Sequence, residues 1–114
     1  MATELETVRI DKEEWLEFAN QFTKDNEGRP VTVEIVDPEL GDQEEAEAVP
    51  FVALTYDAKH TGEFIITIGR EPDLVDHQVD KPKEVWVEKG PDGRVMALAI
   101  ISETGTQHII HFHD

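Results

Sequence analysis

The chain of 114 residues carries 26 acidic and 10 basic residues, a formal net charge of -16 at pH 7, and no cysteine. The absence of cysteine excludes disulfides, thiolate metal sites and cysteine nucleophiles. The excess of acid argues against direct binding of nucleic acid or anionic lipid, whose phosphates it would repel.

Length and apolar content predict one folded domain over residues 1–114. A chain of this size can bury a single core without disulfides or metals, and 39% of its residues are apolar. The N-terminus lacks the basic and apolar regions of a signal peptide, and no apolar run approaches the ~20 residues that span a bilayer. We therefore expect a cytoplasmic protein that does not bind membranes.

An amphipathic helix is predicted over about residues 11–23. Asp11 and Glu14 have the spacing of a capping box at its start. One apolar stripe then follows at helical spacing on an otherwise charged segment: Trp15, Phe18, Ala19 and Phe22. We expect this stripe to cover a sheet.

The rest of the chain alternates between apolar runs and short turns, which predicts antiparallel strands. The predicted strands are 31–35, 51–56, 64–68, 85–87, 95–101 and 107–113. Residues 69–76 are predicted as a connecting loop. Because residues 96–101 are apolar on both faces, we expect this strand to be buried at the centre of the sheet or in a small barrel. The predicted fold class is α+β, with an N-terminal helix packed on an antiparallel sheet of about six strands, open or curled into a small barrel.

A long acidic segment separates Arg29 from Lys59, with no basic residue between them. Five of its acidic residues form a candidate interaction surface for a basic protein partner: Glu39, Asp42, Glu44, Glu45 and Glu47. The acidity has two alternative roles. It can simply keep the surface solvated, or it can be an adaptation to a high-salt cytoplasm that screens a large net charge.

Three histidines lie on the last predicted strand. Alternation places His111 and His113 on one face, and His108 on the other. Two histidines at this spacing can chelate zinc or copper, with Asp114 as a further oxygen ligand, so His111 and His113 are the candidate metal ligands. The alternative is a solvent-facing pair on a terminal strand. We expect His108 to be half-buried and hydrogen-bonded rather than catalytic.

Two further residues are candidates for a site. His77 lies near Asp73, Asp76 and Asp80, in a predicted acidic loop where a histidine can act in general acid–base chemistry. Arg70 follows a predicted buried strand and can hold either a carboxylate of the protein itself or an anionic ligand.

Established catalytic motifs are missing from the sequence. It has no signature of serine hydrolases, P-loop or dinucleotide-binding proteins or zinc proteases, and it contains a single serine. We therefore predict no catalytic residue and no cofactor.

Four segments, taken in order, resemble a family of small prokaryotic proteins known as the DUF5335 family. They are residues 10–15, 28–34, 37–41 and 68–72. The resemblance covers nearly the whole chain. It implies a small bacterial or archaeal protein that stands alone, and it carries over no activity, cofactor or catalytic residue.

Three functions fit these observations. The first is a non-enzymatic interaction or accessory protein whose acidic surface contacts a basic partner, either as a monomer or as a homodimer paired through a strand edge or the face of Trp86. The second is a small β domain that binds a metal or small ligand. The third is an enzyme that uses His77 or clustered carboxylates. The sequence favours the first of these.

Overall fold

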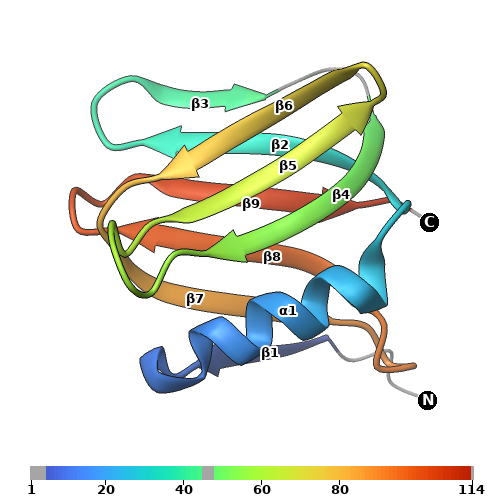
Figure 1. Cartoon of the computed structure of the whole chain (residues 1–114), viewed down its shortest axis with the longest axis horizontal. Coiled ribbons are helices and arrows are strands. Elements are labelled where there is room, and N and C mark those ends of the chain that lie inside the picture. The colour runs from blue at the N-terminus through green and yellow to red at the C-terminus, as the bar shows by residue number, and fades with distance from the viewer. Residues whose placement is uncertain (1–4, 45–47, 114) are drawn as a thin grey trace.

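The computed structural model describes residues 5–44 and 48–113, which form an antiparallel sheet and one α-helix (Figure 1). The elements in chain order are β1 (Glu6–Ile10), the 3-10 turn η1 (Lys12–Glu14), α1 (Trp15–Asn26), β2 (Pro30–Asp37), β3 (Gly41–Glu44), β4 (Val49–Tyr56), β5 (Phe64–Arg70), β6 (Asp73–Val79), β7 (Pro82–Lys89), β8 (Val95–Ser102) and β9 (Gln107–Phe112). The α-helix of these described residues is too short and too polar to cross a bilayer.

The strands follow the spatial order β1-β7-β8-β9-β2-β4-β5-β6, and β3 pairs with β2. Strands β2 and β4 are joined only at one corner, where Pro30 lies opposite Pro50 and Val31 opposite Val49. Beyond this corner the two strands diverge, and the sheet folds over. As a result, β4, β5 and β6 form a layer in front of β2, β9 and β8 (Figure 1).

The predicted fold class is wrong in two respects. Sheet dominates the described residues, with nine strands and a single α-helix of 12 residues, rather than about six strands in an α+β packing. The strands at the two ends of the order, β1 and β6, do not pair with each other within these residues, so the sheet is not closed into a barrel. The prediction of antiparallel pairing is confirmed.

The prediction misses three strands, β1, β3 and β6. Each of them has one pairing partner in the described part of the sheet. An edge strand buries less apolar surface than a central one and often carries charged residues. Its sequence therefore lacks the apolar run by which the other strands are recognised.

The predicted helix is present, with different limits. Residues Lys12–Glu14 form the 3-10 turn, and the α-helix runs from Trp15 to Asn26. Asp11 makes no side-chain capping bond. Instead, the Glu14 amide donates to the backbone carbonyl of Asp11 at 2.9 Å, so the capping-box prediction is wrong.

The predicted apolar stripe of α1 is buried against the folded sheet, where the helix packs on β4. Trp15, Ala19 and Phe22 are 2%, 0% and 4% exposed. Thr23 fixes the helix to β4, because its hydroxyl accepts a hydrogen bond from the Leu54 amide at 2.9 Å and donates to the Leu54 carbonyl at 3.0 Å. The helix thus covers the part of the core that lies next to β4.

Candidate functional site

A cleft of about 510 Å³ lies between the C-terminal half of α1 and the turn that joins β7 to β8. Apolar residues from both elements form part of its lining: Phe18, Phe22, Val87 and Val95. Its polar lining residues are Gln21, Asp25, Asn26, Arg29, Lys89 and Arg94. The cleft thus combines apolar side chains with a charged margin.

The charge of the cleft is opposite to that of the protein. Three of the chain's 10 basic residues line it, Arg29, Lys89 and Arg94, together with one acidic lining residue, Asp25. Charges of one sign that line a cleft with low-dielectric walls produce a focused field. The lining of the cleft therefore has a local excess of basic residues, although the net charge of the chain is -16.

Arg29 is held in a defined orientation beside the cleft. Its Nη1 donates to Oδ1 of Asn26 at 2.9 Å, and its guanidinium carbon lies 4.6 Å from the ring centre of Phe112. Asn26 is 4% exposed, and its Nδ2 donates in turn to the Phe22 carbonyl at 3.0 Å. A planar guanidinium that is oriented in this way suits recognition of a carboxylate or phosphate.

Two tight turns bring the basic residues to opposite walls. Gly28 has a φ of +90° and its amide donates to the Phe51 carbonyl at 2.7 Å, which leads the chain out of α1 to Arg29. On the other wall, the Gly90 amide donates to the Arg94 carbonyl at 2.8 Å. This turn follows Lys89 directly, so Lys89 and Arg94 flank it together.

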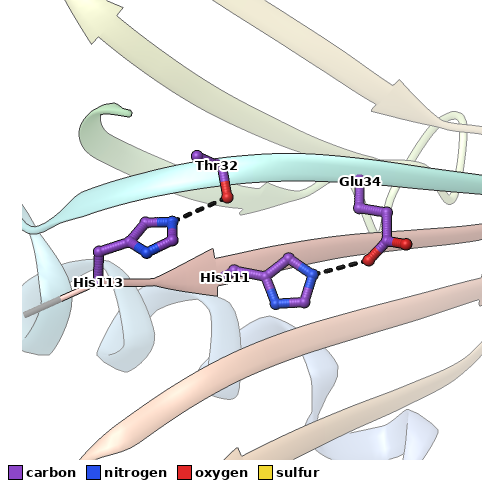
Figure 2. Close-up of polar contacts among 4 residues, drawn as sticks. All are labelled: Thr32, Glu34, His111 and His113. Carbon is purple, nitrogen blue, oxygen red and sulfur yellow. Dashed lines mark hydrogen bonds and ion pairs between the residues drawn. The ribbon is translucent and has the colours of Figure 1, made fainter. Parts of the chain in front are cut away.

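The candidate metal ligands His111 and His113 lie on β9 and just after it, and each contacts a side chain of β2 (Figure 2). Nε2 of His111 lies 2.8 Å from Oε1 of Glu34, and Nε2 of His113 lies 2.9 Å from Oγ1 of Thr32. Residues 5–44 and 48–113 contain no group of three or more histidines and acidic residues placed to hold a metal ion. Asp114 lies outside the described residues. Metal binding by His111 and His113 stays a prediction.

The structure brings His77 and His108 to the same interior, although they are 31 positions apart in the sequence. His77 lies on β6, opposite the buried Ile66, instead of in an acidic loop. His108 lies opposite the buried Ile100. Directly opposed residues share a face of the sheet, so both histidines face inward. Nε2 of His77 is buried and has no hydrogen-bond partner among residues 5–44 and 48–113.

Burial lowers the pKa of His108, and the charge of nearby His77 lowers it further. The unfolded chain therefore binds a proton before the folded chain does, and stability is lost as the pH falls from about 6.5 towards the lowered pKa. We expect the variant His108→Gln to lose less in Tm than the unmodified protein when the pH is lowered from about 7 to about 5.5.

Thermal unfolding followed by circular dichroism at the two pH values measures this difference. His60 is exposed in the turn between β4 and β5, so His60→Gln is the matched control and should lose as much as the unmodified protein. If His108→Gln lost as much Tm as the unmodified protein, His108 would not be the group that lowers stability as the pH falls.

Arg70 lies at the end of β5 and lines a shallow groove of about 320 Å³. Glu71 and Asp73 line the same groove, and Asp73 lies opposite Arg70 in the sheet register. Acidic residues are therefore the charged neighbours of this arginine in the groove. Either predicted role of Arg70 stays a prediction.

Part of the predicted acidic interaction surface lies in the described residues. Glu39 is exposed in the turn after β2, and Asp42 and Glu44 belong to strand β3. Glu45 and Glu47 lie outside the described residues. Contact of this segment with a basic partner stays a prediction.

Comparison with known proteins identifies the family. The sequence model of the "Family of unknown function (DUF5335)" matches residues 6–114. An "Uncharacterized protein" of Aquifex aeolicus (strain VF5) is 35% identical over 104 residues, which cover 91% of this chain and 89% of that protein. No solved structure matches the chain significantly. The resemblance found in the sequence is confirmed, and the chain belongs to the DUF5335 family.

Proposed function

We propose that this protein is a non-enzymatic binding domain that holds a small organic anion in the cleft between α1 and the β7–β8 turn. One observation carries the proposal. Arg29, Lys89 and Arg94 surround apolar side chains in a chain whose net charge is -16. The proposal follows the second function predicted from the sequence, small-ligand binding, but uses the cleft in place of the terminal histidines.

The lining suggests a ligand with an apolar body and one anionic group. The rings of Phe18 and Phe22 lie 5.2 Å apart between their centres and, with the neighbouring valines, offer apolar contact. The basic residues can form charge-assisted hydrogen bonds with a carboxylate. A volume of about 510 Å³ lies within the range of small-molecule sites. A medium-chain or aromatic carboxylate fits this description better than free phosphate.

A displacement titration tests the proposal. Octanoate should displace the fluorescent probe anilinonaphthalene sulfonate from the folded protein, whereas inorganic phosphate at the same concentration should not. We expect Lys89→Ala and Arg94→Ala each to weaken octanoate binding about tenfold, because a hydrogen bond to a charged group is worth about 1.5 kcal/mol.

Lys59→Ala is the control, because Lys59 is an exposed lysine in the β4–β5 turn, outside the cleft. Its affinity for octanoate should match that of the unmodified protein. Equal displacement by phosphate would show a simple anion site and contradict the apolar part of the proposal. Unchanged affinity in both cleft variants would overturn the proposal.

A further inference from the structure

We infer that two copies of this chain associate face to face through the outer surface of β1, β7, β8, β9 and β2. This surface, called here the outer face, is the side of these strands that points away from the core. Helix α1 and strands β4, β5 and β6 lie on the core side (Figure 1). The inference does not depend on the ligand cleft, which is also on the core side.

The central strand of the outer face, β8, is apolar on both sides. Leu98 and Ile100 are 0% exposed and point into the core. Alternation turns Ala97, Ala99 and Ile101 outward, where they are partly exposed. The sequence pattern of this strand predicts burial on both faces. Contact with a second copy would bury the outward face as well.

Register aligns the outward residues in three rows across the strands. The first row is Arg9, Trp86, Ala99, Ile109 and Glu34. The second row is Thr7, Glu88, Ala97, His111 and Thr32. The third row is Glu84, Ile101, Gln107 and Val36. Each row has a residue of β8 near its centre.

The two stacked copies would be related by a two-fold axis that is parallel to β8 and lies midway between them. This axis places each row of one copy over the same row of the other copy, in reverse order. In the first row it sets Arg9 of one copy over Glu34 of the other, and Trp86 over Ile109. Ala99 then lies over Ala99 of the second copy. In the first two rows, alanine at the centre and larger residues beside it let the two sheets approach and interdigitate at the usual spacing of about 10 Å.

The same axis also places the other glutamates of the three rows opposite groups that can pair with them. Glu88 lies over His111 of the second copy, whose Nε2 also lies 2.8 Å from Oε1 of Glu34 in its own chain, and Glu84 lies over Gln107. Each of the three glutamates in these rows thus faces a cation, a histidine or an amide donor, and no two of them are opposed. Complementary charges of this kind select a partner and its orientation. A uniformly basic partner would oppose Arg9, so a second copy fits the face better.

The size of the outer face and the net charge determine the expected strength of the dimer. Four strand spacings of about 4.8 Å and strands of about seven residues give a face of about 19 by 24 Å, which is small for a specific interface. Two copies that each carry a charge of -16 also repel one another until salt screens them. We therefore expect a weak dimer that is strengthened by moderate salt.

Sedimentation over a range of protein concentrations at about 0.15 M KCl tests the inference. The unmodified protein should show a monomer–dimer equilibrium. Ala99→Glu places two carboxylates against each other on the axis and should raise the dimer dissociation constant about tenfold or more. Thr55→Glu adds the same charge at an exposed position of β4, away from the outer face, and should leave that constant unchanged. Circular dichroism establishes that both variants are folded.

A charge exchange gives the second test. Arg9→Glu alone and Glu34→Arg alone should each weaken self-association, because each sets like charges opposite one another. In an equal mixture, each mixed dimer pairs the Arg9→Glu copy with the Glu34→Arg copy. Both contacts between positions 9 and 34 then join opposite charges, so the mixture should dimerise more strongly than either variant alone. A monomeric unmodified protein at every concentration and salt level, no effect of Ala99→Glu, or no gain in the mixture would each overturn the inference.

Discussion

Trp15→Ala should lower the free energy of unfolding by about 3–5 kcal/mol. The side chain of Trp15 is 2% exposed, and its ring centre lies 5.4 Å from that of Tyr56 and 5.3 Å from that of Phe64. Its indole N–H donates to the Ile10 carbonyl at 3.0 Å. Alanine leaves a cavity between α1 and the sheet and removes this donor. Urea denaturation followed by circular dichroism measures the change.

The neighbouring leucine supplies the control for this experiment. Leu16 is 48% exposed on the same helix, so Leu16→Ala should change the free energy of unfolding by no more than about 0.5 kcal/mol. Trp15→Phe keeps an aromatic ring but loses the N–H, and its loss should lie between the two. If Trp15→Ala costs as little as Leu16→Ala, Trp15 does not pack in the core as described.

Gly69→Ala should lower the free energy of unfolding by about 3 kcal/mol. Gly69 has a φ of +121°, a conformation that other residues rarely adopt, and a Cβ added there would lie 2.6 Å from the carbonyl oxygen of Asp73. Asp73 and Leu74 belong to β6, which pairs with β5 at this point. Because both atoms of the clash are fixed to the backbone, a change of rotamer cannot relieve it. The hairpin of β5 and β6 has to shift.

Gly93→Ala separates the clash from the backbone strain. Gly93 also has a positive φ, +81°, but a Cβ there meets no atom of the described part of the chain within 4 Å, so the expected loss is only about 1–2 kcal/mol. Hydrogen exchange should also show faster exchange in β6 for Gly69→Ala alone. Equal losses in the two variants would contradict the close approach of β5 and β6 at Gly69.

The helix shows which structural features a local sequence pattern can predict. Trp15, Ala19 and Phe22 follow helical spacing in the sequence, and all three are buried. The limits of the helix were less predictable, because Asp11 has the spacing of a cap without making the bond. Spacing expresses the geometry of a helix, whereas a capping bond depends on the rotamer and on the path of the preceding chain.

The candidate sites show what a local sequence pattern cannot predict. Arg29 follows α1, while Lys89 and Arg94 flank a turn near the other end of the chain, and only the packing of α1 beside β7 and β8 joins them in one cleft. His77 and His108 are likewise brought to one interior by the fold of the sheet between β2 and β4. The shortage of basic residues was visible in the sequence, but their convergence was not.

The sequence by itself determined the charge, the absence of cysteine chemistry, the apolar helix stripe, the central strands and the family. These properties depend on composition or on spacing within a few residues, which a helix or strand repeats locally. The tertiary structure alone decided the strand order, the three edge strands, the open form of the sheet, the basic cleft and the aligned rows of the outer face. These depend on strand register between distant segments, and that register is set by the packing of the whole core.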